Sequence, residues 1–503
     1  MVRGRQTREG DKPRSAEHAF EESEVVVVPE KPGNSRVTPE DSVEGRTTAN
    51  GISAERNATR AQDRLDALTH LERIGAKARE DKGERFGNLL SFIKVPLLEE
   101  AYWRLRKDAA AGIDGETWSH YGEQLDARLR DLQDRVHRGS YHPQPVRRVH
   151  IPKADGKLRP LGIPALEDKI VQQAARMLLE PIYEQGGFLG FSYGFRPGRS
   201  QHKALDALAV TMSKKVNWVL DADIRSFFDT IDHGWMQKFI EHRIADRRFV
   251  RLLMKWLNAG VMEKGKLHEV EAGTPQGGII SPLLANIYLH YVIDLWVQSW
   301  RKKAGRGEVY IVRYADDLVM GFQREQDARA MRAAMSDRLA KFGLELHPEK
   351  TRVLRFGRFA KTDSVLDGRD RPETFDFLGF THICAQGPTR AFRYIRRTSR
   401  KKRRAKLQAR GDEIGRRKHD RVIDQHRWLN SVLRGHYGYY GVPGNFSALS
   451  SFRHEVLRKW HAALQRRSQR ARWSEERRER FDRAFPLLPA KITHPHPFQR
   501  FAS

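Results

Sequence analysis

Two apolar runs that flank a pair of adjacent aspartates constrain this chain more than any other feature of its sequence. Residues 309–322 read VYIVRYADDLVMGF, and β-branched residues stand on both sides of Asp316 and Asp317. Such runs around turn-forming residues predict two antiparallel strands joined by a tight turn. The two carboxylates repel each other, so the turn is costly unless a cation neutralises them. A solvated Asp-Asp turn is the competing interpretation of this segment alone.

A second acidic strand favours the cation-binding interpretation over the solvated turn. Residues 218–224 read WVLDADI, and strand alternation puts Asp221 and Asp223 on one face. A carboxylate at the end of one strand, facing a carboxylate pair on a neighbouring hairpin, is what two-metal phosphoryl transfer requires, with the ions ~4 Å apart. Asp221 competes for this role, but we favour Asp223 because it lies nearest the strand end and the phenylalanine pair that follows.

The distribution of charge indicates a polyanionic partner. Among 503 residues, Lys and Arg number 92 and Asp and Glu 64, which leaves a net charge of +28. Residues 376–503 hold 30 of these basic residues and only 10 acidic ones. An excess this concentrated is typical of a nucleic-acid surface.

Two segments of this basic region are the candidates for RNA contacts. Residues 390–421 carry 15 Lys or Arg against 3 Asp or Glu, and residues 434–445 interleave aromatic and basic residues with glycines. Aromatic faces and cations can stack on bases and follow an RNA backbone. A solvated basic helix followed by a packed tyrosine turn is the alternative. The predicted RNA-binding residues are Lys401, Lys402, Arg403, Arg404, Arg434, Tyr437 and Tyr439.

Cysteine content and hydropathy exclude several other classes of protein. The single cysteine, Cys384, excludes an intramolecular disulfide framework and a cysteine-built zinc site. No run approaches the ~18 apolar residues of a membrane-spanning helix. The N-terminal charges have no apolar stretch behind them, so they do not form a secretory signal. We therefore expect a cytoplasmic protein without membrane contacts, and leave its oligomeric state open.

The pattern of the chain divides it into five parts of an α+β protein. Little apolar periodicity is present at the start, helical spacing follows, and a long middle part alternates strand-like and helical segments. The basic part that comes next is largely helical, with a break predicted at the Gly- and Tyr-rich residues 434–445. The predicted parts are a disordered leader at 1–55, a helical N-terminal extension at 56–145, a mixed core at 146–380, a basic helical domain at 381–485 and a Pro-rich tail at 486–503.

Further blocks occur in a fixed order around the two acidic strands. They are IPKADGKLRPLGIP at 151–164, YGFRPGRS at 193–200, GTPQGGIISPLLANIYL at 273–289, GLELHPEKT at 343–351, FLGF at 377–380 and RGHYGYYGVPGN at 434–445. Together with Asp-Ile-x-x-Phe-Phe-Asp and Tyr-Ala-Asp-Asp, they resemble group II intron-encoded reverse transcriptases, or maturases. The resemblance runs from about residue 61 to 485. It implies a right-hand polymerase with fingers, a palm built on an antiparallel sheet and an α-helical thumb, or maturase, domain.

The resemblance implies an RNA-directed DNA polymerase. Such an enzyme would copy RNA into DNA with two Mg²⁺ ions and dNTPs, extending a DNA primer or target. It would also bind group II intron RNA to assist splicing and mobility. One alternative is a non-intron bacterial reverse transcriptase serving repair, defence or diversity generation. Another is an RNA-binding splicing cofactor without polymerase activity.

Individual roles follow from the matching positions. The resemblance makes Asp223, Asp316 and Asp317 the catalytic residues and adds Ile224 to the metal-binding positions. Phe228 matches an aromatic gate against the ribose 2′-hydroxyl, with a core phenylalanine as the alternative. Lys350 matches a proton donor for pyrophosphate, with a salt-bridge lysine as the alternative. The nucleotide-binding positions are Lys153, Arg159, Phe228, Gln276 and Lys350.

The end of the sequence carries a further expectation. Many proteins that the chain resembles have a DNA-cutting domain of the His-Asn-His type after the thumb. Here 18 residues follow Phe485, and His494 and His496 stand among prolines that predict an extended segment. We expect the form without this endonuclease, so that synthesis needs an existing 3′ end such as a nascent strand.

Overall fold

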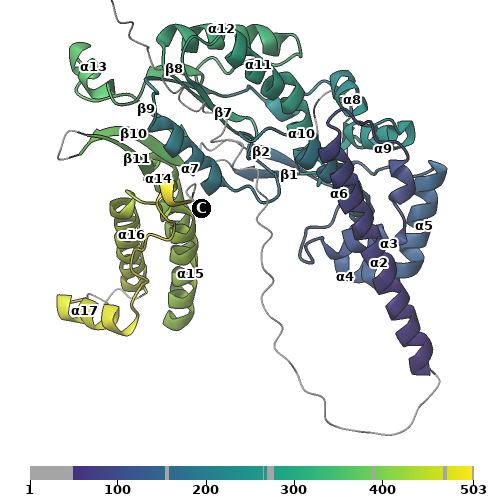
Figure 1. Ribbon diagram of the computed structural model, residues 1–503. Coiled ribbons are helices and arrows are strands. Elements are labelled where there is room, and N and C mark those ends of the chain that lie inside the picture. Colours follow the sequence, from purple (N-terminus) through teal and green to yellow (C-terminus); the bar gives the residue numbers. More distant parts are fainter. Residues whose placement is uncertain are drawn as a thin grey trace, which may run out of the picture.

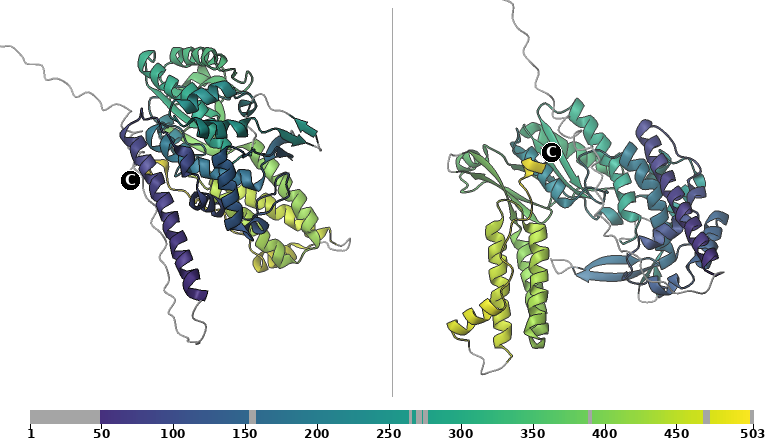
Figure 2. Two further views of the ribbon diagram at one scale, coloured as in Figure 1. Left: turned by 90° about the vertical axis from the view of Figure 1, so that its right-hand side faces the viewer. Right: turned by 60° about the horizontal axis from the view of Figure 1, so that its bottom comes forward.

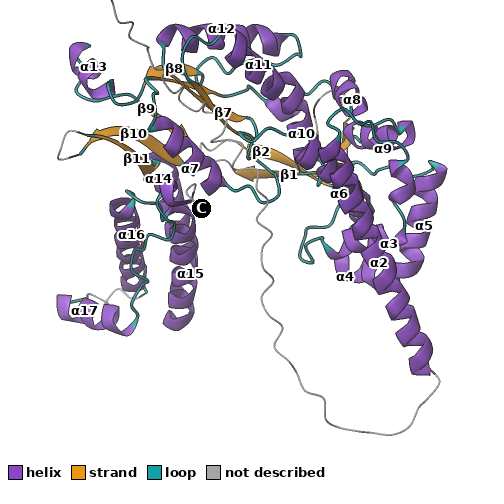
Figure 3. Cartoon of the chain, in the orientation of Figure 1, coloured by secondary structure: helices purple, strands orange, loops and turns teal. Residues whose placement is uncertain are grey.

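The computed structural model describes residues 49–152, 158–263, 266–268, 273, 277–387, 391–467 and 473–500. A purple-to-blue helical region and a green-to-yellow helical region flank a central part that contains most of the strands (Figures 1 and 3). None of the helices in these ranges combines the length and apolar character that a membrane crossing needs.

The N-terminal region is helical, as its apolar spacing predicts. Helix α2 packs along α6, and its first turns project away from the rest of the molecule (Figure 1). Because α2 begins at Ala49, the helix starts inside the segment predicted to be a leader. The elements are α2 (Ala49–Glu80), η2 (Leu89–Phe92), α3 (Val95–Trp103), α4 (Trp118–Gly122), α5 (Leu125–Arg138) and α6 (Leu166–Gly186).

A small sheet lies next to this helical region, in the order β2-β1-β4-β5. Strands β1 and β2 pair antiparallel, whereas β1 and β4 pair parallel. The strands are β1 (Val146–Pro152), β2 (Leu158–Ile163), β4 (Val261–Glu263) and β5 (Lys266–His268).

The central sheet has the order β6-β7-β3-β8, and every neighbouring pair is antiparallel, which confirms the predicted hairpin. Alternation sends Leu220 and Met320 into the large core shared with the helices and sends Val219 and Val319 into a second core against α7. Both faces are therefore buried. The strands are β3 (Trp218–Ala222), β6 (Val309–Tyr314), β7 (Asp317–Phe322) and β8 (Arg352–Arg355).

Helices cover both faces of this sheet. Helix α7 lies on one face, and α12 contacts three strands on the other. Between α10 and α11 the chain forms one π-helical turn, η4. The elements are α7 (Gln201–Met212), η3 (Phe227–Asp229), α8 (His233–Glu241), α9 (Arg247–Leu257), α10 (Ser281–Leu289), η4 (His290–Asp294), α11 (Leu295–Lys303), α12 (Glu325–Ala340) and α13 (Ala360–Leu366).

A third sheet, β11-β10-β9, leads into the C-terminal helices. The C-terminal helices have a separate hydrophobic core, which includes Trp460 and Leu429. The predicted break at 434–445 is wrong for residues 434–440, because these complete α15 and the chain turns only after Tyr440. The elements are β9 (Thr374–Phe377), β10 (Phe380–Gln386), β11 (Phe392–Thr398), α14 (Arg400–Arg416), η5 (Arg417–His419), α15 (Val422–Tyr440), α16 (Phe446–Gln465), α17 (Glu475–Ala484) and α18 (Pro497–Arg500).

The tail runs back along the bundle to the central part. The Thr493 amide donates to the Gly441 carbonyl at 2.8 Å. Farther on, the His494 ring stacks on His202 of α7 with centroids 3.7 Å apart. Helix α18 then contacts α7, which places the last described residues beside the central part (Figure 2). The tail is therefore largely extended, as predicted, but it is packed along its length.

Candidate active site

The strand register brings the two acidic segments together. In the antiparallel pair of β3 and β7, Ala222 lies opposite Leu318. Continued by one residue, this register sets Asp223, which directly follows β3, opposite Asp317, the first residue of β7. The sequence predicts this neighbourhood from alternation alone, and the pairing of the strands adds the register.

The turn of the hairpin holds the other aspartate. Tyr314 pairs with Asp317, which leaves Ala315 and Asp316 as the two turn residues. Ala315 has φ 56°, a left-handed conformation that costs a residue with a Cβ about 1–2 kcal/mol. Glycine is the usual residue at such a hairpin position. The surrounding structure therefore has to hold this turn.

A cleft of about 1010 Å³ is lined by Asp317, the residue after this turn, and by Asp221 and Asp223, whereas Asp316 is not among its lining residues. The basic residues Lys350, Arg352 and Arg371 line the cleft as well. The first residues of α14 and the end of β11 supply further basic residues, which are Arg397, Arg400, Lys401 and Arg403. Acidic and basic side chains thus face the same space.

Crowding of the carboxylates changes their protonation. Desolvation, followed by the negative charges of Asp316 and Asp223, raises the pKa of Asp317 to about 7. The Asp317 residue as a whole is exposed to the cleft, while its carboxyl lies among the other acids. Burial also raises the pKa of Asp221 to about 7, against the opposing effect of Arg352. A cation in the cleft would reverse these shifts, because it favours the ionised carboxylates.

Lys350 supplies the cation nearest to Asp223. Its Nζ donates a 2.7 Å hydrogen bond to Asp223 Oδ2, although the lysine side chain is 60% exposed. The main chain of Asp223 is held separately, because its carbonyl accepts from the His347 amide at 2.8 Å. The ammonium therefore occupies one side of a carboxylate whose backbone is fixed.

The Ile224 carbonyl is directed toward the acidic hairpin. Ile224 forms an isolated antiparallel bridge with Leu346, and the two hydrogen bonds of that bridge belong to its neighbours, Asp223 and Arg225. Successive strand residues direct their backbone groups to opposite sides. The carbonyl of Ile224 thus turns away from Leu346, to the side on which β7 lies.

These oxygen donors suit a hard divalent ion such as Mg²⁺. Strands and backbone bonds fix them, and the charges of Asp316, Asp223 and Asp221 add to desolvation in raising the pKa of Asp317, so negative charge is concentrated there. In the part of the chain that the structure describes, no three His, Cys, Asp or Glu side chains converge as a formed metal site.

The predicted nucleotide-binding residues are only partly within the described residues. Lys153 and Gln276 lie outside them, and Arg159 is a backbone member of β2 opposite Ile151. Phe228 lies in η3, half-buried, with its ring 5.3 Å from that of Phe227.

Two glycines near this site let backbones approach closely. A Cβ on Gly277 would lie 2.3 Å from the Gly162 carbonyl, and one on Gly273 would lie 2.8 Å from the Phe228 carbonyl. Both glycines also have positive φ. Gly277 is thus in close contact with β2, and Gly273 is in close contact with η3.

The basic residues divide between two surfaces. Lys401 and Arg403 line the cleft, whereas Lys402, Arg404 and Arg434 are exposed outside its lining. All of them except Arg434 lie on α14, which places four consecutive basic residues around the first turns of one helix.

The prediction that Tyr437 contacts RNA is contradicted by its packing, whereas Tyr439 is half-buried and its RNA contact stays a prediction. Tyr437 is buried in the core of the C-terminal bundle, and its hydroxyl donates to the Leu488 carbonyl at 3.0 Å. The Tyr439 ring packs beside Phe380, and its hydroxyl donates to the Leu378 carbonyl at 2.9 Å. Both tyrosines join elements of the fold.

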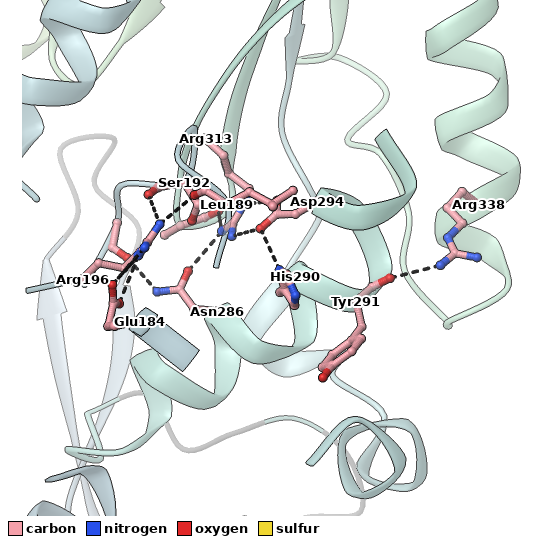
Figure 4. Close-up of polar contacts among 12 residues, drawn as sticks. Glu184, Leu189, Ser192, Arg196, Asn286, His290, Tyr291, Asp294, Arg313 and Arg338 are labelled. Carbon is pink, nitrogen blue, oxygen red and sulfur yellow. Dashed lines mark hydrogen bonds and ion pairs between the residues drawn. The ribbon is translucent and has the colours of Figure 1, made fainter. Parts of the chain in front are cut away.

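Sequence reasoning missed a buried polar cluster beneath the acidic turn. Arg313 of β6 is fully buried and pairs with Asp294 of η4, which is also fully buried. Figure 4 shows this pair beside Asn286, with Arg196 and Glu184 farther along the same cluster. An arginine inside the apolar run VYIVRY was the available signal.

Comparisons with known proteins agree with this geometry. The family described as reverse transcriptase (RNA-dependent DNA polymerase) matches residues 151–382. Protein YkfC of Escherichia coli (strain K12) is 39% identical over 287 residues, which cover 50% of this chain and 75% of that protein.

Two further relatives match shorter shares of their own length. The group II intron-encoded protein LtrA of Lactococcus lactis subsp. cremoris is 40% identical over 242 residues, 47% of this chain and 39% of that protein. The retron Mx162 reverse transcriptase of Myxococcus xanthus is 29% identical over 244 residues, 44% of this chain and 47% of that protein. The chain thus spans three quarters of the first relative and less than half of the other two.

Proposed function

The chain belongs to the reverse transcriptase family, and from this we propose that it copies RNA into DNA at the acidic cleft and binds group II intron RNA to assist splicing and mobility. The observation that carries the polymerase part is the register of β3 and β7, whose continuation sets Asp223 opposite Asp317 in a cleft that the basic residues of α14 also line. The similarity to a group II intron-encoded protein supports the intron part.

The three regions correspond in this proposal to the parts of a right-hand polymerase. The helical extension at 56–145 and the β1–β2 sheet form the fingers, the central antiparallel sheet forms the palm, and residues 381–485 form the thumb or maturase domain. The cleft between the central sheet and α14 then receives the primer–template duplex, whose phosphates would meet Lys401 and Arg403.

The acidic residues would hold two Mg²⁺ ions. When bound, these ions favour ionisation of the primer 3′-hydroxyl and neutralise the departing pyrophosphate. Asp223 and Asp316 would be the main ligands, with Asp317 and the Ile224 carbonyl completing the oxygen donors. Lys350 must leave Asp223 as the cations enter, and its ammonium can then donate a proton to pyrophosphate.

The remaining nucleotide contacts come from the matching motif positions. Lys153 and Arg159 would bind the triphosphate, since a point charge and a planar fork both suit phosphate oxygens. Gln276 would line the nucleotide pocket, and Phe228 would crowd a ribose 2′-hydroxyl. On the outer surface, Lys402, Arg404 and Arg434 would contact intron RNA.

A non-intron reverse transcriptase is the second candidate, because the chain also resembles a retron reverse transcriptase. An RNA-binding cofactor without polymerase activity fits less well. Such a protein gains nothing from carboxylates crowded enough to raise the pKa of Asp317 to about 7. Splicing of the transcript that surrounds the gene, measured with and without the protein, distinguishes intron from non-intron use.

Primer extension tests the polymerase function directly. Purified protein with an RNA template, a DNA primer, dNTPs and Mg²⁺ should yield full-length cDNA. Asp223→Asn and Asp316→Asn should abolish extension while primer–template binding persists, because the metals stabilise the transition state rather than the duplex. Asp221→Asn, on the same strand and in the same cleft, is the matched comparison. If Asp221→Asn abolishes extension and Asp223→Asn does not, the assignment of the first ligand is wrong.

A further inference from the structure

We propose that Arg313, fixed by Asp294 and Asn286, is a positioning residue that sets the conformation of the Ala315–Asp316 turn and thereby the metal affinity of the site. This proposal rests on the proposed polymerase function and deepens it. It concerns how the fold holds the two aspartates rather than what they bind.

Arg313 lies inside the core. Arg313 is the next-to-last residue of β6, and strand alternation sends it to the same face as Ile311, toward α10 and η4. An arginine in such a core is stable only if its donors are satisfied. Every nitrogen of its guanidinium has an acceptor within this cluster.

Arg313 forms a two-pronged hydrogen bond with the carboxylate of Asp294. Its Nε and Nη2 donate to the two carboxylate oxygens of Asp294 at 2.7 and 2.6 Å. The neighbouring His290 does not supply a positive charge here, because burial lowers the pKa of His290 to about 4. Arg313 is therefore the charge partner of Asp294, and the bidentate geometry fixes the plane of the guanidinium (Figure 4).

The guanidinium of Arg313 also contacts the acidic turn. The remaining nitrogen, Nη1, donates to the Ala315 carbonyl at 2.9 Å and to Asn286 Oδ1 at 3.1 Å. The Ala315 carbonyl belongs to the peptide that joins Ala315 to Asp316. A bond from a fixed guanidinium to this oxygen thus sets the orientation of the peptide from which Asp316 starts.

The turn is also held from below. Asn286 Nδ2 donates to the Gly194 carbonyl at 2.6 Å. A Cβ on Gly194 would lie 2.3 Å from the Ala315 nitrogen, so the backbone at Gly194 is in close contact with the turn. The amide of Tyr193 donates to the Arg313 carbonyl at 2.8 Å, which ties the same segment to β6.

These contacts explain how an alanine keeps φ 56° at a position that favours glycine. The left-handed conformation is imposed by a buried bond to its carbonyl and by the backbone beneath its nitrogen. If Arg313 loosens, the turn relaxes toward ordinary φ values and Asp316 moves away from Asp223. The metal site would weaken even though no metal ligand has changed.

The test compares Arg313→Lys with Arg243→Lys. Lysine keeps the charge but cannot form the fork. Arg243 is a matched control, because it is also buried and donates to the Glu84 and Gly186 carbonyls instead of the turn. Mn²⁺ binding by electron paramagnetic resonance, single-turnover extension, primer–template affinity and melting temperature are measured for each variant.

For Arg313→Lys we expect Mn²⁺ affinity and the extension rate to fall by at least about tenfold, with primer–template affinity changed by less than about twofold. Arg243→Lys should lower the melting temperature without these effects. Adding Ala315→Gly to Arg313→Lys should restore part of the Mn²⁺ affinity, because glycine adopts positive φ without help.

Unchanged Mn²⁺ affinity per folded molecule in Arg313→Lys would overturn the proposal. If Arg313→Lys does not fold, Asn286→Ala decides by the same measurements. It removes the bond from Arg313 Nη1 and the bond to the Gly194 carbonyl, and it leaves the pair of Arg313 and Asp294 intact. If the wild-type protein binds Mn²⁺ but does not extend a primer on RNA, the proposed function fails. The Mn²⁺ measurements would still decide the role of Arg313.

Discussion

Lys350 and Asp223 form a 2.7 Å ion pair at the edge of the acidic cluster, on a lysine that remains mostly exposed. An exposed pair of this kind contributes little to folding. Its position makes it a competitor of the metal, because the ammonium and a divalent cation use the same carboxylate.

Removing this ammonium separates metal binding from chemistry. In Lys350→Ala, Mg²⁺ should half-saturate the enzyme at a lower concentration, because nothing competes for Asp223. The maximal extension rate should fall by about 10²–10⁴-fold if Lys350 is the proton donor to pyrophosphate. Lys350→Arg should keep the competition and lose the proton transfer. A lysine that is only a salt-bridge residue would leave the maximal rate of both variants near that of the wild type.

The protonation of Asp317 gives the site a pH dependence. Since the Asp317 pKa of about 7 lies above the usual value, the metal-free site gains the negative charge that attracts Mg²⁺ as pH rises through 7. The apparent Mg²⁺ affinity should therefore increase between pH 6 and pH 8, and the dependence should weaken in Asp317→Asn. Titrating Mg²⁺ at several pH values measures this.

The same shift affects stability with the opposite sign. Because the folded-state pKa of Asp317 is raised, the folded protein holds this proton over a pH range in which the unfolded chain has lost it. Without metal, the free energy of unfolding should fall as pH rises from about 4 to 7, and Mg²⁺ should restore it. Asp317→Asn should melt a few degrees above the wild type at pH 8 in the presence of a chelator. An equal melting temperature would contradict the shift.

Phe228 tests selection between sugars. Its half-buried ring packs on Phe227, so one part of it belongs to the core and another part is exposed. Phe228→Ala should increase incorporation of ribonucleotides relative to deoxynucleotides, because atoms that crowd the 2′-hydroxyl are gone. Competition between the two nucleotides in one reaction measures the ratio. A constant ratio with a lower melting temperature would assign Phe228 to the core alone.

Exposed residues of α14 test RNA binding apart from the cleft. Changing Lys402 and Arg404 to Gln should weaken RNA binding and reduce the slope of log affinity against log salt by about 1.4, if each residue contacts one phosphate of single-stranded RNA. The matched control changes Arg130 and Arg138, which are exposed on α5 and paired with acids of their own helix. The same reduction in the control would mean that net charge, rather than this surface, governs binding.

Tyr437 tests the correction made by the structure. Tyr437→Phe removes the hydroxyl that donates to the Leu488 carbonyl and should lower stability by about 1 kcal/mol. RNA affinity should not change, since the ring is buried in the bundle. Weaker RNA binding at unchanged stability would return Tyr437 to the RNA surface.

Local patterns predicted the acidic hairpin correctly. The β-branched runs and the turn residues predicted the hairpin at Asp316 and Asp317. Asp223 was predicted at the end of a strand, and only the pairing of that strand with β7 was needed to bring Asp223 near the hairpin. The cost of Gly435 and Gly438 in a helix, about 1 kcal/mol each, favoured a break around Tyr437. Burial of Leu433 and Tyr437 against the other helices outweighs this cost.

Contacts between distant elements could not be predicted in this way. The partner of Arg313 is Asp294 on η4, and no periodic pattern links an edge strand to a π-helical turn. The packing of the tail could not be predicted from the sequence either. The hydrogen bond from the Thr493 amide to the Gly441 carbonyl joins two backbones and does not depend on either side chain.

The packed tail has a mechanical consequence for the cleft. The C-terminal bundle is attached to the rest of the molecule at several points: the His494 ring stacks on His202, the His202 ring contacts the Tyr439 carbonyl at 2.8 Å, and the Tyr439 hydroxyl donates to the Leu378 carbonyl. Each attachment opposes a rotation that the others would allow. A duplex that enters the cleft would therefore meet walls at a fixed spacing, and the tail helps to set that spacing.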